Sequence, residues 1–279
     1  MSTITKCLFP VAGYGTRFLP ATKAIPKEML PVLVQPLIQY GVEEAMSAGM
    51  TTMTMVTSKH KQAIKNHFEP HTDIEASIKG TDKEEHLSEV NRISKQCDFT
   101  YINQQQMLGL GHAIYTGKPL IGNETFAVVL PDDLCTNNGD SVLTQMTKIY
   151  EQHPECCIVA IEEVPMDEVD KYGVIDSELL QGSNDAYRVK SMVEKPSPDE
   201  APTNLAIIGR YILTPEIFDV LENTAPDKNG EIQITDALMT LAKEGKVIAY
   251  KFQGTRFDCG SVKGHLMANI AFAKAAGMI

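Results

Sequence analysis

"FPVAGYGTRFLPATKAIPKEMLPV", residues 9–32, follows directly on the first apolar segment of the chain. It contains two closely spaced glycines, Gly13 and Gly15, and three cationic side chains, Arg17, Lys23 and Lys27. A tight turn beside positive charge suits a polyanion such as a triphosphate, because its backbone N–H groups can form an anion-binding nest. Arg17 would offer a forked donor and Lys27 a point charge. A glycine turn with solvated cations is the alternative interpretation.

Two common phosphate-binding motifs do not fit this stretch. A dinucleotide fingerprint requires G-x-G-x-x-G, and Phe18 stands where the third glycine should be. The P-loop pattern G-x-x-x-x-G-K-[ST] occurs nowhere in the chain. Any phosphate-binding turn here is therefore of a different kind.

Composition limits the class of protein and its partners. The chain has 279 residues, of which 43% are hydrophobic and 22% charged, so it can bury a sizeable core. We expect one α/β domain with a C-terminal extension. With 36 acidic and 25 basic residues the net charge is −11, which argues against broad binding to nucleic acid or anionic membranes.

The opening segment, residues 1–15, is not typical of a secretory signal, because its apolar run is short and is broken by Pro10 and Gly13. No apolar run approaches the roughly 20 residues that cross a bilayer. The six cysteines include no C-x-x-C pair, and we expect most of them to be reduced core residues. A cytoplasmic protein is the expected result.

Short β-rich runs alternate with helical patterns in the first 165 residues. Strands are expected at 5–11, 51–57, 99–103, 125–131 and 156–164, and helices at 36–49, 60–68, 109–117 and 140–152. Strands separated by helices predict a mostly parallel sheet covered on both faces. Since ligands of such sheets bind beyond the carboxyl ends of the strands, the loops after residues 11, 103 and 131 should line one crevice.

The rhythm changes after about residue 165. An antiparallel pair is expected at 171–178 and 186–196, with a further strand at 205–213. A helix at 230–245, strands near 247–252 and 255–260, and a last helix at 262–277 follow.

Carboxylates stand at two expected strand ends. Asp132 and Asp133 follow a buried strand, and Asp258 ends another within "RFDCG". Carboxylates that meet substrate phosphates suit Mg²⁺, although adjacent aspartates are just as common in turns and helix caps. Glu194 and Lys195 pair an acid with a base before a proline, where a surface ion pair is the alternative.

The whole chain resembles a known family. "GYGTRFLPATKAIPKEMLP", "QQQMLGLGHA", "LPDD", "YGV", "EKP", "GRYIL", "GEIQITDA" and "FDCG" follow the order and approximate spacing of bacterial UTP–glucose-1-phosphate uridylyltransferases, or UDP-glucose pyrophosphorylases. The resemblance runs from residue 5 to about 270, and the block at 13–31 is its most specific part. The stretch "GSVKGH" after Asp258 departs from the family, which more often has bulkier, more apolar residues there.

This resemblance implies a single Rossmann-like sugar nucleotidyltransferase domain over 1–279. Its nucleotide-binding part would span about 1–165, and a small antiparallel sugar-binding region with C-terminal helices about 166–279. The implied reaction converts UTP and glucose 1-phosphate to UDP-glucose and pyrophosphate with Mg²⁺. The implied assembly is a homo-oligomer, a dimer or a tetramer, without nucleic-acid or membrane partners.

The resemblance also implies roles for individual residues. Arg17, Lys27 and Lys195 would act on the phosphates in catalysis, and Asp132 and Asp258 would bind Mg²⁺. The nucleotide would be bound by Ala12, Gly13, Gly15, Glu28, Gln104 and Gly109. The sugar side would be formed by Gly173, Glu194 and Lys195.

The implied chemistry fits these residue types. A sugar phosphate oxygen is already negative, so it needs no general base to attack the α-phosphorus, and catalysis depends on positioning and charge stabilisation. A related enzyme that makes dTDP- or ADP-glucose is an alternative. A catalytically silent nucleotide-sugar sensor is a second, but it predicts the loss of at least one of four charged residues that are all present here, Arg17, Lys27, Asp132 and Asp258.

Overall fold

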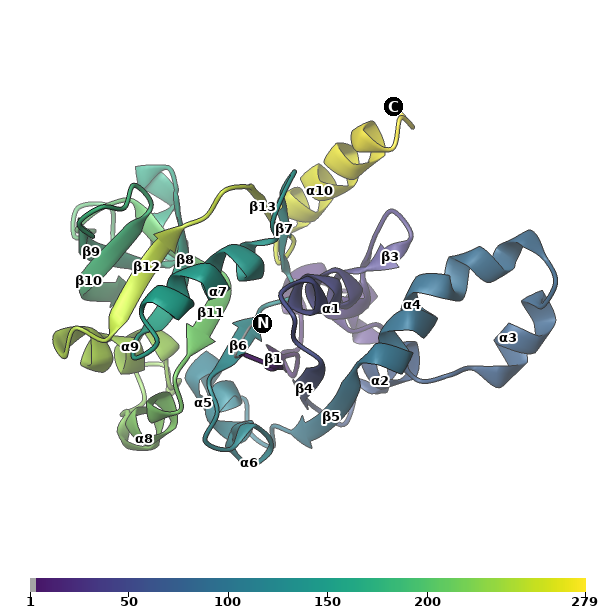
Figure 1. The fold of residues 1–279 in the computed structure, drawn as a ribbon, viewed down its shortest axis with the longest axis horizontal. Coiled ribbons are helices and arrows are strands. Elements are labelled where there is room, and N and C mark those ends of the chain that lie inside the picture. The colour runs from purple at the N-terminus through teal and green to yellow at the C-terminus, as the bar shows by residue number, and fades with distance from the viewer. Residues whose placement is uncertain (1–3) are drawn as a thin grey trace.

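One nine-stranded sheet lies at the centre of the molecule (Figure 1), and its central strands are buried on both faces whereas its edge strands are partly exposed. The computed structural model describes residues 4–279. The strands lie in the order β5-β4-β1-β6-β11-β8-β12-β10-β9. They are β1 (Lys6–Pro10), β4 (Thr52–Thr57), β5 (Asp98–Asn103), β6 (Phe126–Val129), β8 (Cys157–Glu163), β9 (Gly173–Leu179), β10 (Ala186–Glu194), β11 (Leu205–Leu213) and β12 (Val247–Lys251).

The sheet is mixed, so the expectation of a mostly parallel sheet is wrong. Strands β5, β4, β1 and β6 pair in parallel, as expected for strands joined by helices. Strand β11, however, runs antiparallel to both β6 and β8, its neighbours in the centre of the sheet. The expected antiparallel pair of β9 and β10 is confirmed, and it extends the same sheet through β12.

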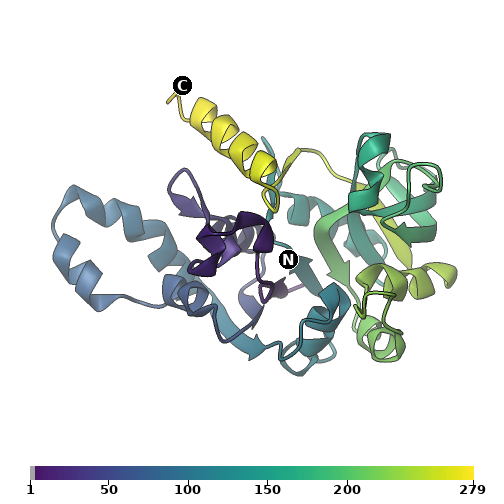
Figure 2. The ribbon, with the colours of Figure 1, turned by 180° about the vertical axis from the view of Figure 1, so that it is seen from behind.

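Helices cover both faces of the sheet (Figures 1 and 2). The helices within residues 4–279 are α1 (Leu37–Ser47), α2 (Gln62–Phe68), α3 (Thr72–Ile78), α4 (Glu85–Gln96), α5 (Gly109–Thr116), α6 (Lys118–Ile121), α7 (Val142–Gln152), α8 (Glu216–Asn223), α9 (Ile234–Lys243) and α10 (Val262–Ala275). The helix expected at 230–245 begins at Ile234. Helices α3, α4, α6 and α8 were not predicted from the sequence.

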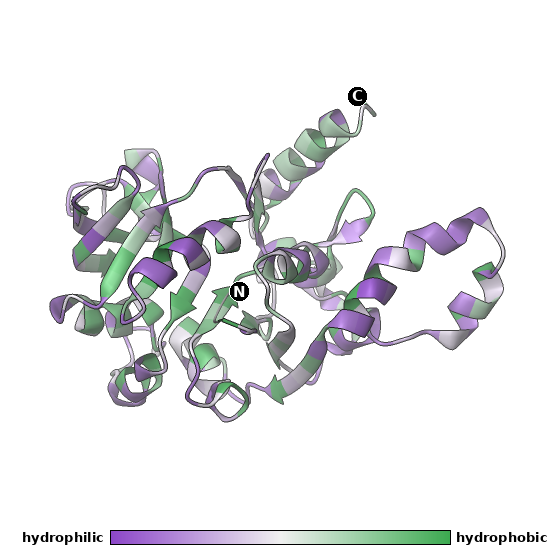
Figure 3. Ribbon diagram, viewed as in Figure 1, coloured by the Kyte–Doolittle hydropathy of each residue, from purple (hydrophilic) through white to green (hydrophobic). Residues whose placement is uncertain are grey.

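The alternation of side chains along each strand divides the core into two layers. Within β1, Phe9 belongs to the apolar cluster that includes Ile38 of α1, whereas Leu8 belongs to the cluster of α5, α8 and α9 on the opposite face. In this second cluster Phe126 and Phe218 stack with their ring centroids 5.1 Å apart. Strands β6, β11 and β12 are accordingly green, that is, hydrophobic, over most of their length in Figure 3.

Two smaller sheets lie beside the main one. Strand β7 (Asp133–Thr136), which was not predicted, pairs antiparallel with β13 (Thr255–Asp258). The short strands β2 (Pro31–Val32) and β3 (Gln35–Pro36) form a hairpin. The pairing of β7 with β13 places Asp133 opposite Asp258.

Helices α3, α4 and α10 extend away from the sheet in both views (Figures 1 and 2). Helix α3 buries none of its residues, and it is largely hydrophilic together with α4 (Figure 3). Among residues 4–279, none of the helices has both the length and the apolar character that a membrane span requires.

Candidate functional site

The loop after β1 folds back on itself through a glycine. Gly15 has φ +67, and a Cβ atom on it would lie 3.0 Å from the Cβ atom of Lys27. The hydroxyl of Thr22 donates a hydrogen bond of 2.7 Å to the carbonyl oxygen of Gly15. Three 3₁₀ turns, Thr16–Phe18, Ala21–Lys23 and Lys27–Met29, complete the loop. The first and last of these turns place Arg17 and Lys27 at the carboxyl edge of the parallel strands.

Both cations face the carboxylates that follow the later strands. Lys27 Nζ lies 2.6 Å from Asp132 Oδ2. Burial alone would raise the pKa of the Asp132 carboxyl, but the Lys27 ammonium holds that pKa below its ordinary value. Arg17 Nη1 donates to the carbonyl oxygen of Gly260 at 3.5 Å.

Asp132 and Asp258 converge on Gly260. Asp132 Oδ2 and Asp258 Oδ1 would lie 2.9 Å and 3.0 Å from a Cβ atom on this glycine, so the two oxygens are less than about 6 Å apart. Burial and repulsion by Asp133 raise the pKa of Asp258. Within residues 4–279 there is no group of three or more His, Cys, Asp or Glu side chains that could hold a metal ion. A pair of carboxylates does fit Mg²⁺, which takes one or two carboxylates together with substrate phosphates.

Asp133 is held in a different way from its neighbour. Its Oδ1 accepts from Arg256 at 2.6 Å, and its Oδ2 accepts from the backbone N–H of Gly209 at 2.7 Å. Arg256 also contacts Glu162 and Tyr172, and its side chain is only 6% exposed. Asp133 therefore supports the architecture, and Asp132 is the carboxylate directed toward the loop cations.

A buried arginine holds the turn that carries these two aspartates. Arg210 of β11 donates from Nη1 to the carbonyl oxygen of Leu130 at 3.1 Å and from Nη2 to that of Asp133 at 2.7 Å. Its Nε and Nη2 also bond Glu44 of α1, at 3.0 Å and 2.8 Å. The Arg210 side chain is 1% exposed. The ion pair of Arg210 with Glu44 therefore holds both ends of the turn around Asp132, at Leu130 and at Asp133.

The antiparallel strands β9 and β10 carry the candidate residues for the sugar. Gly173, the first residue of β9, lies opposite Glu194, the last residue of β10. Thr235 donates to Glu194 Oε2 at 2.6 Å, and a Cβ atom on Gly173 would lie 3.2 Å from the same oxygen. Lys195 has an unusual φ of +48, and its Nζ lies 3.2 Å from Glu194 Oε1.

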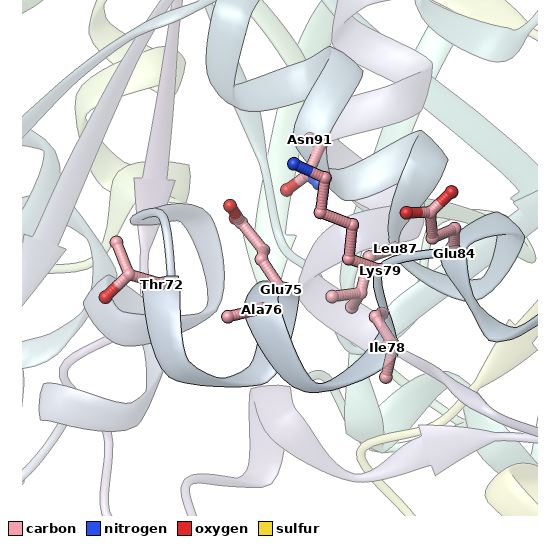
Figure 4. Close-up of a pocket in the computed structure, with 8 residues that line it drawn as sticks. All are labelled: Thr72, Glu75, Ala76, Ile78, Lys79, Glu84, Leu87 and Asn91. Carbon is pink, nitrogen blue, oxygen red and sulfur yellow. The ribbon is translucent and has the colours of Figure 1, made fainter. Parts of the chain in front are cut away.

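One cavity of about 790 Å³ lies between the residues of the first loop and the aspartates on one side and the ends of β9 and β10 on the other. Its lining includes Arg17, Asp132, Asp258, Gly173, Glu194 and Lys195. The structure thus brings six of the candidate residues, from both halves of the chain, to one crevice. A second cavity, of about 480 Å³, lies between α3 and α4 and contains none of them (Figure 4).

The remaining nucleotide candidates lie at the ends of β1 and β5. Ala12 is buried, whereas nothing lies within 4 Å of a Cβ atom placed on Gly13. Gln104 is also buried, and its Nε2 lies 3.5 Å from the carbonyl oxygen of Gly109 and 2.8 Å from His112 Nδ1. Leu110, next to Gly109, lines the large cavity, while Gln104 is not among its lining residues.

Glu28 is the most buried of the candidate carboxylates. Its Oε2 lies 2.6 Å from Lys61 Nζ, and the two side chains are 0% and 6% exposed. Burial raises the pKa of Glu28 despite the opposing charges of Lys61 and Lys27. No hydrogen-bond partner for the buried Glu28 Oε1 lies among residues 4–279. One oxygen of this buried carboxylate is thus left without a hydrogen-bond partner among those residues.

The unusual "GSVKGH" stretch forms the beginning of α10. Ser261 caps this helix by accepting from the N–H of Gly264 at 3.0 Å. A Cβ atom on Gly264 would overlap the carbonyl oxygen of Asp258. Small residues therefore let α10 begin directly against the loop that holds Asp258.

Comparison with known proteins assigns the family. The profile of the family described as nucleotidyl transferase matches residues 10–275. The chain therefore belongs to the nucleotidyl transferase family. It is 60% identical over 266 residues to a UTP–glucose-1-phosphate uridylyltransferase of Pseudomonas aeruginosa, covering 95% of this chain and 94% of the relative.

Two solved structures agree with this relationship. A UDP-glucose pyrophosphorylase complexed with UDP-glucose has a TM-score of 0.90 and 54% identity, covering 98% of this chain and 99% of its own. A UTP-bound enzyme of the same kind from Acinetobacter baumannii has a TM-score of 0.87 and 38% identity, covering 97% and 93%. The resemblance drawn from the sequence motifs is confirmed.

Several residues that shape the site were not predicted. They are Glu44, Lys61, His112, Tyr172, Arg210, Thr235 and Arg256. Each is a polar residue within an ordinary helix, strand or loop pattern. Most have partners distant in sequence, as Arg210 and Glu44 are 166 positions apart, although His112 and its partner Gln104 are separated by only 8. The only signal available was the presence of arginine within the apolar run "GRYIL".

Proposed function

We propose that this protein catalyses the formation of UDP-glucose and pyrophosphate from UTP and glucose 1-phosphate. The observation that carries the proposal is the single crevice in which Arg17 and the paired aspartates lie with Gly173, Glu194 and Lys195. Lys27 adjoins this crevice through its ion pair with Asp132. The similarity to UTP–glucose-1-phosphate uridylyltransferases over nearly the whole chain supports the same conclusion.

The reaction requires two anions to be brought together. A phosphate oxygen of glucose 1-phosphate forms a bond to the α-phosphorus of UTP, and the bond from that phosphorus to the bridging oxygen of pyrophosphate breaks. Arg17 and Lys27 would bind the triphosphate and stabilise the charge that collects on the departing pyrophosphate. Lys195 would bind the phosphate of the sugar substrate and hold it in line. No proton needs to be removed from the attacking oxygen.

Asp132 and Asp258 would hold Mg²⁺ together with the phosphates of the nucleotide. When bound, the ion offsets the repulsion between the two substrates. Lys27 already neutralises Asp132 in the structure, at 2.6 Å. Because substrate phosphates would attract the same ammonium group, Lys27 could turn from Asp132 to the triphosphate, which would leave the Asp132 carboxylate free to hold the ion.

The nucleotide would lie over the ends of β1 and β5. Ala12, Gly13 and Gly15 would let the backbone approach the phosphates closely. Gln104 and Gly109 would meet the uracil, and the unpaired Glu28 Oε1 would accept from the nucleoside. These assignments place the nucleotide in residues of about 1–165, and the sugar in residues of about 166–279.

The sugar would be bound by the junction of β9 and β10. Glu194 accepts from Thr235 through Oε2 and pairs with Lys195 through Oε1, and its remaining lone pairs would accept from hydroxyl groups of the sugar. Gly173 lies close enough to Glu194 that a side chain there would narrow the space. We further propose a homo-oligomer, dimer or tetramer, and a cytoplasmic location.

The test is a pyrophosphate-release assay over a matrix of nucleoside triphosphates and sugar 1-phosphates with Mg²⁺. The proposal expects the highest kcat/KM for UTP with glucose 1-phosphate. Higher kcat/KM with dTTP or ATP would instead favour an enzyme for dTDP- or ADP-glucose. No pyrophosphate release from any pair, in a folded protein that binds UTP, would favour the silent sensor.

A further inference from the structure

The orientation of the Gln104 side-chain amide is fixed by two neighbours. Its Nε2 lies 2.8 Å from His112 Nδ1 and 3.5 Å from the carbonyl oxygen of Gly109. A carbonyl oxygen can only accept a hydrogen bond, so the NH₂ group of Gln104 must be the group that faces it. His112 Nδ1 then has to act as an acceptor, and the ring proton resides on Nε2.

Helix α5 holds His112 firmly in this role. The helix is anchored at its beginning, where Gly111 donates to the carbonyl oxygen of Ile232 at 2.9 Å and Ile232 donates to that of Leu108 at 2.8 Å. A Cβ atom on Gly111 would lie 2.7 Å from the same Ile232 oxygen, so the helix packs closely there. Burial lowers the pKa of His112, which favours the neutral ring that can accept.

The side-chain oxygen of Gln104 lies at the other end of this amide group. Since NH₂ is engaged by Gly109 and His112, the amide oxygen is the atom left for a ligand. Uracil presents an N–H donor at N3, whereas cytosine presents an acceptor at the corresponding ring nitrogen. An oxygen facing that position attracts uracil and repels cytosine, and a reversed amide would do the opposite.

We propose that His112 is a positioning residue for base selection: it locks the Gln104 amide so that oxygen, not NH₂, is presented to the base. This inference rests on the proposed function, in which Gln104 meets the uracil. Thymine has the same N3–H donor as uracil, so His112 should have no influence on discrimination between those two bases.

The experiment measures kcat/KM for UTP and for CTP, and the ratio of the two is the readout. His112→Leu removes the acceptor and leaves only the long contact to Gly109, so the ratio should fall about tenfold, the value of one hydrogen bond of about 1.4 kcal/mol. His112→Phe keeps the ring shape without the nitrogen and should behave alike. His112→Asn places an amide oxygen near the position of Nδ1 and should restore the ratio to within about threefold of wild type.

Three controls separate this role from a structural one. A mere loss of packing would lower kcat/KM for UTP and for CTP equally and leave their ratio unchanged. An unchanged ratio in His112→Leu and His112→Phe, with both variants folded, would overturn the proposal. The ratio of dUTP to dTTP should be the same in every His112 variant. The KM for pyrophosphate in the reverse reaction should also be unaffected.

Gln104→Leu distinguishes the inference from the assignment on which it rests. If Gln104→Leu abolishes the preference for UTP over CTP but the His112 variants keep it, His112 does not orient the amide and only the inference fails. If Gln104→Leu also keeps the preference, Gln104 does not read the base, and the assignment and the inference fail together. If the preference for UTP over CTP falls in Gln104→Leu and in the His112→Leu and His112→Phe variants, and recovers in His112→Asn, the proposal is supported.

Discussion

Asp132 and Asp133 are adjacent and chemically identical, yet the structure predicts opposite consequences for their replacement by asparagine. Asp133→Asn removes the charge that faces Arg256, whose side chain is 6% exposed and lies 2.6 Å away. Breaking a buried ion pair from one side costs about 3 kcal/mol, which corresponds to a fall in Tm of about 5–10 °C for a domain of this size. Glu162 still pairs with Arg256 in this variant, so the arginine keeps one carboxylate partner. This remaining pair limits the loss of free energy of unfolding.

Asp132→Asn should leave stability nearly intact, because its partner Lys27 is partly exposed and such pairs contribute at most about 1 kcal/mol. Its turnover should fall at least about a hundredfold, because the asparagine amide is a poor ligand for Mg²⁺ at the reacting phosphates. Thermal unfolding and pyrophosphate release, measured on both variants, give the two readouts. If Asp133→Asn abolishes turnover without lowering Tm, or Asp132→Asn retains near wild-type turnover, the division of roles is wrong.

Four further substitutions test other parts of the site. Arg17→Ala and Lys27→Ala should each lower kcat at least about a hundredfold, since both cations would bind substrate phosphates. Their Tm should fall little, because the ion pair of Lys27 with Asp132 is partly exposed and contributes at most about 1 kcal/mol; wild-type rates in either variant would contradict this. Lys195→Met should raise the KM for glucose 1-phosphate far more than that for UTP, and equal effects on both constants would refute its assignment to the sugar phosphate. Arg210→Lys should lower kcat about tenfold while the KM for UTP stays nearly constant, because a single ammonium group cannot hold both carbonyls of the aspartate turn and the carboxylate of α1. Unchanged kcat in that variant would show that the turn holds its shape without the guanidinium.

Much of the parallel half of the fold follows from local sequence patterns. Apolar runs of the right length predicted β1, β4, β5 and β6, and helical periodicity predicted α1, α2 and α5. The position of the crevice follows in part. The loops after residues 11 and 131 line it, as expected at the carboxyl ends of parallel strands, whereas the loop directly after residue 103 does not and Leu110 of α5 lines it instead. The structure indeed collects Arg17, Lys27 and Asp132 at that edge.

The order of strands in the centre of the sheet could not be predicted in the same way. Strand β11 reads as a buried strand in isolation, and nothing in "LAIIGRYIL" indicates that it runs antiparallel between β6 and β8. This direction depends on contacts between segments more than 75 residues apart in the chain, such as the bond from Arg210 to Asp133. The burial of Arg210 could not be predicted for a similar reason. A buried guanidinium is favourable only when its partner, here Glu44, is in place, and Glu44 lies far from Arg210 in the sequence.

The neighbouring aspartates illustrate the limit for the site itself. Sequence alone offers Asp132 and Asp133 as equal candidates for a metal ligand, and only the family resemblance ranks them. In the structure Asp133 is occupied by Arg256 and by the backbone of Gly209, whereas Asp132 faces Gly260 together with Asp258. The distinction depends on hydrogen-bond partners, which no local pattern records.

The most direct test of the account is the Mg²⁺ dependence of turnover in Asp132→Asn, Asp258→Asn and the double variant. If the two carboxylates share one ion, each single variant should need at least about tenfold more Mg²⁺ for half-maximal rate, and the double variant should be little worse than either single one, because groups that act as a unit are not additive. Near-normal turnover at low Mg²⁺ in either single variant, or fully additive losses in the double variant, would contradict the shared site.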